Sequence, residues 1–338
     1  MPAVWRGLAS CLLSGVLAAG LMAPPALAHE DAPSTAEALF AGAGHEAAVL
    51  AAAAYVPPTD SLPKAFQGLD YDGYRKLRPR PDRMVWGETG NPFAVLPLPR
   101  GGLYNDRVAL HFVDASGARH TGAPAFVDFV DYPWATDGDR RALGASGWRA
   151  ITKPGQAGAG YEFAVFQGGT YFRVVGEGQI YGVSARALAI GTGSSAGEEF
   201  PRFTDFWIIQ PATGADSLTF IALADSPSAA AAYRFVLRPG SDAAVEVVAE
   251  IHPRIDISEA GVAPLSSMYL HGGADPRAGR DLRPEVHDSD GLSIRTASGE
   301  HIWRPLANPR SVQLSAFTGT PAAFGLEQRR RMLAHQMG

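Results

Sequence analysis

The run 283–293 brings together the side chains best suited to chemistry in this chain. It holds three carboxylates, a histidine and an arginine, namely Arg283, Glu285, His287, Asp288 and Asp290. So dense a cluster is costly unless its members are hydrated, paired or used in a reaction. Shortly afterwards, Trp303 and Arg304 add an aromatic face beside another cation. Carboxylates handle protons and hydroxyls and flat rings stack on sugars, so the run indicates a polysaccharide-processing cleft.

Plainer interpretations of the same run stay open. Asp288 to Gly291 reads Asp-Ser-Asp-Gly, which is a common composition for a tight turn. His287 beside Asp288 is typical of a hydrogen-bonded structural histidine more often than of a metal ligand. The nine histidines of the chain show no ligand spacing, so we expect no metal site.

A second charged group lies in the middle of the chain. Arg186 and Arg202 bracket the pair Glu198-Glu199, and an aromatic stretch that includes Trp207 follows. One interpretation is a buried ion network that holds a long loop. The other is a loop that lines the cleft, since ordered loops on a β scaffold often carry sites. Local sequence does not separate the two.

Two further motifs favour structural roles. Asp70 and Asp72 suit a surface turn that caps a short helix better than they suit a sugar site. The stretch 193–197 fits the G-x-S-x-G pattern of a hydrolase nucleophile. However, Pro201 follows too closely for the helix which that motif requires, so we interpret it as a plain loop.

The composition excludes several function classes. Cys11 is the only cysteine, and it lies in a segment that we expect to be removed. The mature chain would therefore contain no disulfide, no cysteine-bound zinc and no thiol nucleophile. The net charge of −5 argues against a nucleic-acid partner. The chain has neither a complete dinucleotide fingerprint nor a G-K-[ST] motif, so we expect no nucleotide cofactor, and no other cofactor is indicated.

The first residues have the order of a secretory signal. Arg6 precedes an apolar stretch, and Ala26-Leu27-Ala28 forms a small-x-small cleavage site, so residues 1–28 are predicted to be a signal peptide. No other stretch could span a membrane, so no stable span is expected after cleavage. Residues 29–57 are predicted to form an N-terminal helix and linker, with the Ala-rich helix near 35–54.

Strand signals dominate the rest of the chain. Short runs of β-branched and aromatic residues recur between Gly and Pro turns, at 107–113, 162–166, 171–175, 217–223, 232–237, 243–251 and 291–295. Many short strands separated by turns are typical of a β-sandwich or barrel. The sequence therefore predicts an all-β protein with one main helix.

Several runs resemble the OpgG/OpgD family of periplasmic glucan biosynthesis proteins, also called MdoG/MdoD. The matching runs are Leu69–Arg75 with Arg80–Arg83 and Trp86, Tyr171–Arg173, Tyr181–Arg186, Gly197–Phe203 with Phe206–Ile208, Ala263–Met268, Arg283–Ser293, Ile302–Leu306 and Gly325-Leu326. Together they cover roughly residues 56–328. The resemblance implies a large galactose-mutarotase-like β-sandwich (supersandwich) over 58–328 and an Arg-rich tail over 329–338.

The resemblance also implies a periplasmic role in making osmoregulated glucans, with β-1,2-linked glucan as partner and the membrane glucan synthase as a further candidate partner. Some relatives are inverting β-1,2-glucanases, which need one carboxylic acid and one base. Matching them residue by residue makes Asp288 the candidate general base and Asp290 a weaker one. The candidate substrate-binding residues are Glu198, Arg202, Trp207, Arg283, Glu285, His287, Trp303 and Arg304.

The resemblance has departures as well. Relatives continue with more of the sandwich and an immunoglobulin-like domain, so we expect a sandwich that is incomplete at its C-terminus. Their general acid lies in that later part, and His301 stands where relatives have Trp. Three hypotheses follow: a β-1,2-glucanase or transglycosylase, a glucan-binding protein without turnover, and an inactive truncated family member.

Overall fold

The computed structural model of the chain describes residues 34–329 apart from 81, 83, 88–89, 115–116, 119–129, 132–133, 153–159, 277–280, 310 and 312–314. The predicted signal peptide and nearly all of the predicted tail lie outside these residues. The main helix is α1 (Thr35–Ala52), close to the predicted bounds. Ser34 and Glu37 form a capping box at its start, and each satisfies a backbone N–H that would otherwise lack a partner.

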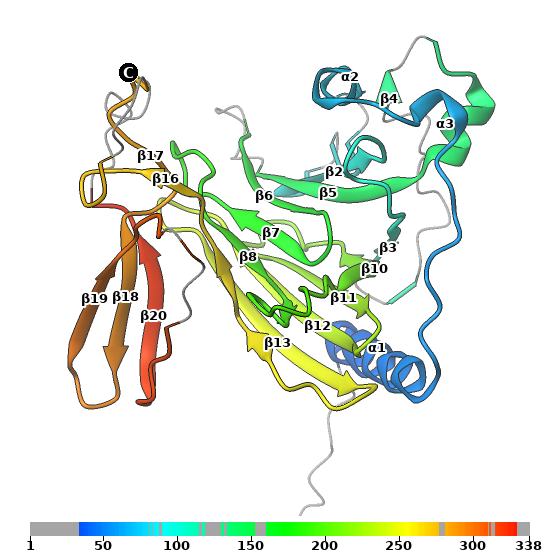
Figure 1. The fold of residues 1–338 in the computed structure, drawn as a ribbon. Coiled ribbons are helices and arrows are strands. Elements are labelled where there is room, and N and C mark those ends of the chain that lie inside the picture. The colour runs from blue at the N-terminus through cyan, green and yellow to red at the C-terminus, as the bar shows by residue number, and fades with distance from the viewer. Residues whose placement is uncertain are drawn as a thin grey trace, which may run out of the picture. The chain divides into compact units, whose positions relative to one another are not determined.

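Two large sheets make up most of the fold (Figure 1). The first contains β3 (Ala109–Val113), β10 (Arg202–Ile209), β11 (Leu218–Asp225), β12 (Ala229–Arg238) and β13 (Ala244–Pro253), in the order β13-β12-β11-β10-β3. The second contains β2 (Phe93–Pro99), β5 (Ala145–Thr152), β6 (Glu162–Gln167), β7 (Tyr171–Val174), β8 (Ser184–Arg186) and β15 (Leu265–Ser266), in the order β15-β8-β7-β6-β5-β2. Within these two sheets, only β3 and β10 pair in parallel.

Aromatic side chains from both sheets meet in one core. Trp148 of β5 stacks on Phe166 of β6 with ring centroids 5.0 Å apart. Phe220 of β11 approaches both rings edge-on at 4.9 Å, and Phe235 of β12 lies 5.4 Å from Phe166. All four rings are fully buried. This shared core makes the two sheets a sandwich and confirms the predicted all-β class.

The helix α1 covers the outer face of the five-stranded sheet. Its small residues Ala43 and Ala47 pack against Ile221 of β11 and Ala230 of β12. Arg254 fixes the end of the helix, because its guanidinium donates to the carbonyls of Leu50 and Ala53 at 2.8 Å. None of the described helices is both long enough and apolar enough to cross a membrane.

The outer strand of this sheet, β13, carries an apolar row on the side that faces the core. Val245, Val247, Ala249 and Ile251 lie opposite Leu237, Phe235, Tyr233 and Ala231 of β12, which are all buried. Val247 is nevertheless 43% exposed. Among the described strands, β13 pairs with β12 alone, so its other edge is open.

A smaller layer of short helices lies beside the sandwich. The elements η1 (Lys64–Phe66), α2 (Tyr71–Arg75) and α3 (Asp137–Leu143) enclose a minor core around Phe66, Leu77 and Leu143, next to the β1–β4 pair (Arg78–Pro79 and Val130–Asp131). Arg100, which is fully buried, ties this layer to the sandwich. It pairs with Asp60 at 3.0 Å and donates to the carbonyls of Asn105 and Leu143.

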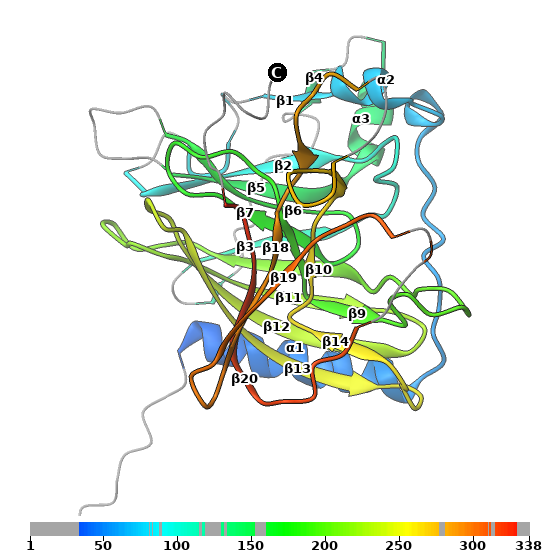
Figure 2. The same cartoon turned by 60° about the vertical axis from the view of Figure 1, so that its left-hand side comes forward.

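The last elements form small sheets (Figure 2). These are β9 (Leu188–Ile190) with β14 (Ala260–Val262), β16 (Tyr269–His271) with β17 (Val286–His287), and β18 (Gly291–Thr296) between β19 (His301–Pro305) and β20 (Pro321–Glu327). The strands predicted at 162–166, 171–175, 217–223, 232–237, 243–251 and 291–295 are confirmed within a few residues as β6, β7, β11, β12, β13 and β18.

Candidate functional site

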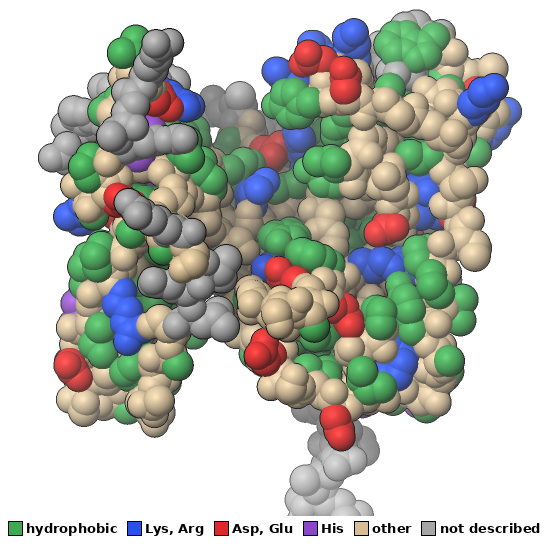
Figure 3. Space-filling model, viewed as in Figure 1, with side chains coloured by type: hydrophobic (Ala, Val, Ile, Leu, Met, Phe, Trp, Pro, Cys, Tyr) green, Lys and Arg blue, Asp and Glu red, His purple; other side chains and the backbone are tan. Residues whose placement is uncertain are grey.

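A cavity of about 410 Å³ opens beside the hairpin that joins β6 and β7. Figure 3 shows a hollowed face there, where hydrophobic, basic and acidic side chains lie close together. Three segments line the cavity: the β6–β7 hairpin, the turn before β3, and the start of β10. The lining residues are Leu103, Tyr104, Asp106, Val165, Gln167, Gly168, Gly169, Tyr171, Phe172, Arg173, Phe200 and Arg202.

The hairpin turn can approach its neighbours because two glycines occupy it. Gly168 and Gly169 have φ of 80° and 59°, a region that L side chains rarely adopt. A Cβ on Gly168 would lie 3.1 Å from the ring of Tyr104. The glycine pair therefore lets Tyr104 lie against the turn, where it forms one wall of the cavity.

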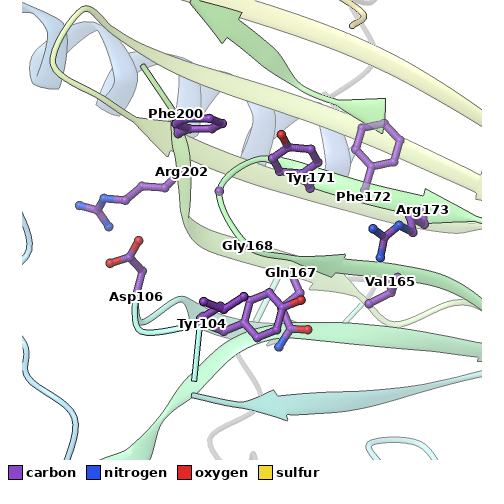
Figure 4. A pocket seen from close by; sticks show the side chains of 12 residues that line it. Tyr104, Asp106, Val165, Gln167, Gly168, Tyr171, Phe172, Arg173, Phe200 and Arg202 are labelled. Atoms are coloured by element: carbon purple, nitrogen blue, oxygen red, sulfur yellow. The ribbon is translucent and has the colours of Figure 1, made fainter. Parts of the chain in front are cut away.

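Figure 4 shows how the polar and aromatic groups are distributed. Arg202 and Asp106 lie at one end of the cavity and Arg173 lies at the other. Tyr171 and Phe200 are on one side, and Tyr104 and Gln167 are on the opposite side. Hydrogen bonds hold both arginines: Arg173 donates to Ser184 at 2.6 Å, and Arg202 donates to Tyr55 at 3.4 Å.

Gln167 is fixed at the base of the cavity. Its Nε2 donates to the hydroxyl of Tyr74 at 2.7 Å and to that of Ser146 at 2.8 Å. Tyr74 in turn donates to the carbonyl of Pro99. Burial raises the pKa of Tyr74 to about 12, so its hydroxyl stays neutral and this network is complete at ordinary pH.

Arg186 lies behind the aromatic wall. Its guanidinium is 4.8 Å from the ring centre of Tyr171 and 5.5 Å from that of Phe200, and it forms an ion pair with Glu198. Glu199 instead accepts hydrogen bonds from the backbone and side chain of Ser228. Within this charged group only Arg186 and Glu198 pair as ions among the described residues, and the loop that follows them brings Phe200 and Arg202 to the cavity.

Asp288 lies next to the segment that follows β15, the edge strand of the six-stranded sheet. Its Oδ2 accepts a hydrogen bond from the Met268 N–H at 2.9 Å. Ser289 next to it shares a hydrogen bond of 2.6 Å with Ser267, which directly follows β15. A Cβ on Gly182 would lie 3.7 Å from the Asp288 carbonyl. Asp288 is half-buried, and within the described chain its Oδ1 accepts no hydrogen bond.

The neighbouring residues of the 283–293 run form a buried ionic cluster. The His287 side chain is 2% exposed and stacks on Tyr269 at 5.6 Å. Its Nε2 lies 3.4 Å from Glu285 and 3.7 Å from Asp290, but neither ring nitrogen makes a hydrogen bond among the described residues. Asp290 also accepts the backbone N–H of Arg329 at 2.7 Å. The described residues contain no group of three ligands that could hold a metal ion.

The other predicted site residues are spread over the molecule. Trp207 is 8% exposed and lies in the cluster beneath α1, stacked on His111, so it does not line the cavity. Arg283 pairs with Asp281 at the surface, and Arg304 donates to Ser315. Trp303 packs over Gly291, where a Cβ would lie only 2.5 Å from its ring.

The two motifs interpreted as structural take local roles. Asp70 caps α2 by accepting the Gly73 N–H at 2.7 Å, as predicted. The G-x-S-x-G stretch forms turns between β9 and β10, and a strand follows it instead of a helix. Tyr104, Phe200 and Tyr171 were not predicted from the sequence as lining residues, although Phe200 and Tyr171 lie in runs that match the family. The glycine pairs at 101–102 and 168–169 could have indicated the two tight turns that border the cavity.

Comparison with known proteins supplies the family context. The profile of the family described as "Periplasmic glucan biosynthesis protein, MdoG" matches residues 40–337. The chain is similar to "Glucans biosynthesis protein G" of Rhodopseudomonas palustris (strain ATCC BAA-98 / CGA009), with 46% identity over 85% of this chain and 57% of the relative. The proteins of the same name from Ralstonia nicotianae and Shewanella sp. (strain MR-4) are 44% and 41% identical, over 83% and 84% of this chain and 56% and 52% of theirs. The chain thus spans about half the length of these relatives.

Proposed function

Because the chain belongs to the MdoG family of periplasmic glucan biosynthesis proteins, we propose that it binds β-1,2-linked glucan in the periplasm and serves glucan biosynthesis there. The observation that carries the proposal is the cavity between Tyr104, Tyr171 and Phe200, with Arg173 and Arg202 at its ends. Flat rings offer stacking surfaces for the apolar faces of glucose units, and the cations donate to hydroxyls. A neutral polysaccharide needs both.

The strands beside the cavity offer a route for an extended ligand. Tyr171 and Arg173 lie on β7, and the adjacent strands β8 and β15 lead towards Ser267 and Asp288. A glucan lying across these strands would pass from the aromatic cavity to the half-buried carboxylate. Such an arrangement uses the six-stranded sheet as a rigid platform for several sugar subsites.

Binding is tested by calorimetry with linear and cyclic β-1,2-glucan, with a β-1,3-glucan as the linkage control. We expect affinity for the β-1,2-linked chains alone, and we expect Phe200→Ala to weaken it by about tenfold. Ile255→Ala is the matched control, because Ile255 is 58% exposed and Phe200 is 55% exposed, but Ile255 does not line the cavity. Equal affinity for both linkages, or equal effects of the two substitutions, would refute the proposal.

A second candidate function is inverting cleavage or transfer of β-1,2-glucan with Asp288 as general base. The observation that favours it is the Oδ1 of Asp288, which accepts no hydrogen bond from the described residues, beside an Oδ2 that the Met268 N–H holds in place. A carboxylate fixed through one oxygen can activate water with the other. Its test is the anomeric form of any product: inversion releases the α-anomer first, which NMR detects before mutarotation. Products of β form would exclude this candidate.

A further inference from the structure

Arg186 contacts two parts of the protein that belong to different segments of the chain. On one side it stacks over Tyr171 and Phe200, the two rings on one side of the cavity. On the other side its Nε donates to Ser266 in β15 at 3.4 Å, and its backbone N–H donates to the Pro264 carbonyl at 3.0 Å. Its side chain is only 9% exposed.

The segment that Arg186 holds through Ser266 continues directly to Asp288. Ser267 shares a hydrogen bond with the fully buried Ser289. Met268 then forms a reciprocal pair with Asp288: Met268 donates to the carboxylate at 2.9 Å, and Asp288 donates to the Met268 carbonyl at 2.8 Å. One unbroken series of contacts therefore runs from the cavity rings through Arg186 to the candidate base.

We infer that Arg186 is a positioning residue. It fixes the position of the Asp288 carboxylate relative to the aromatic rings of Tyr171 and Phe200 in the cavity wall. This inference rests on the proposed function, since the relative position of the two groups matters only to a ligand that contacts both the cavity rings and Asp288. Glu198 supports the role, because its ion pair with Arg186 neutralises the guanidinium, which lies 4.8 Å from the ring centre of Tyr171 and 5.5 Å from that of Phe200.

Lysine cannot replace this arginine. A guanidinium is planar, stacks on aromatic faces and presents several donors in a fixed fork, whereas an ammonium is a compact, strongly hydrated point charge. Arg186→Lys keeps the charge opposite Glu198. It loses the flat contact with Tyr171 and Phe200 and the hydrogen bond to Ser266. Arg254→Lys is a suitable control, because Arg254 is another poorly exposed arginine that pairs with a carboxylate, Asp225, and contacts a tyrosine, Tyr55.

Amide hydrogen exchange tests the positioning role without any ligand. In Arg186→Lys we expect the amides of Met268 and Asp288 to exchange at least about tenfold faster, while the core amide of Phe220 is unchanged. Arg254→Lys should leave Met268 and Asp288 as they are. Ser266→Ala removes only the hydrogen bond between Arg186 and β15, so exchange should become faster by a smaller factor. This variant replaces Arg186→Lys in the test if Arg186→Lys does not fold. Unchanged exchange at Met268 and Asp288 would overturn the inference.

Calorimetry with β-1,2-glucan tests the consequence. We expect Arg186→Lys to weaken binding by about tenfold, because the aromatic wall loses its cation–π partner. Arg234→Lys, at a partly buried arginine that pairs with Glu246 and does not line the cavity, should bind like the parent. Unchanged affinity alongside faster exchange would overturn the link between Arg186 and the ligand. If the parent itself does not bind β-1,2-glucan, the proposed function fails, and the exchange experiment still decides whether Arg186 positions Asp288.

Discussion

Met268 and Asp288 hold each other through two hydrogen bonds, one from the Met268 N–H to the carboxylate and one from the Asp288 N–H to the Met268 carbonyl. Asp288→Asn keeps both, because an amide oxygen also accepts from an N–H. We therefore expect unchanged folding and glucan affinity within about threefold, but a loss of about 10²–10⁴-fold in any β-1,2-glucan hydrolysis, as for removal of a general base.

The measurement is product release followed by chromatography, with calorimetry for affinity. Asp256→Asn, at an exposed carboxylate in the segment after β13, is the control and should change neither. Equal turnover in Asp288→Asn and the parent would remove Asp288 from the mechanism.

Trp148 should dominate the energetics of the sandwich core. It is fully buried and touches Phe166, Phe206 and Phe220, so we expect Trp148→Ala to lower the free energy of unfolding by about 3–5 kcal/mol. Its Nε1 has no hydrogen-bond partner among the described residues. Trp148→Phe removes this unpaired donor and keeps most of the volume, so its cost should be below about 2 kcal/mol. Denaturant unfolding of both variants checks the order, and equal costs would contradict it.

Asp60 should make stability depend on acid. Partial burial raises the pKa of its carboxyl, but the hydrogen bond from Arg107 and the charges of Arg100 and Arg107 outweigh burial and lower it below 3.8. A lowered folded-state pKa means that the stabilisation is fully present above about pH 4 and is lost as pH falls through the folded-state value.

Asp60→Asn should therefore destabilise the protein at pH 7, by about 1–3 kcal/mol, because the buried Arg100 loses its charged partner. The difference from the parent should shrink as pH falls below 3.8 and through the lowered folded-state pKa of Asp60. Thermal unfolding from pH 7 to pH 2.5 measures it. A difference between parent and variant that stays constant over this range would contradict the prediction.

The open edge of β13 should promote self-association. A long edge strand with exposed apolar residues is a template for pairing with another strand, and a lysine on such an edge opposes it. We expect Val247→Lys to reduce concentration-dependent association in sedimentation velocity experiments. Ala244→Lys adds the same charge on the opposite face of the strand and should have less effect. Equal association in the two variants would show that the apolar row is not responsible.

Part of the strands could be predicted from sequence, because an alternating or apolar run marks strands such as β6, β11 and β12. The long strands β2, β5 and β10 were not predicted. Which strands pair with each other could not be predicted from sequence. The parallel contact between β3 and β10 joins His111 to Trp207, and nothing in either local pattern indicates the other. Trp207 was assigned to a cleft because it follows a charged loop, but a buried tryptophan under a helix has the same local sequence.

The candidate site shows the same division. The charge density of 283–293 marked this run, but only the resemblance to the family singled out Asp288, which lies half-buried next to Met268. The cavity residues Tyr104 and Phe200 belong to two turns far apart in sequence. They line one cavity only because the sandwich places the β6–β7 hairpin of one sheet beside the start of β10 in the other, where the Phe203 N–H donates to the Gly169 carbonyl. Long-range placement of this kind leaves no periodic signal.

The docking of α1 has a consequence for the order of folding. The helix is made early by the ribosome, but the surface it covers, with Ile221 and Ala230, belongs to strands that are made much later. Arg254, which donates hydrogen bonds to the carbonyls at the end of α1, is made later still. The helix must therefore wait, exposed and only weakly amphipathic, until β11, β12 and the segment after β13 are in place. A chaperone that binds unfolded nascent chains therefore has a long interval in which to bind the exposed helix.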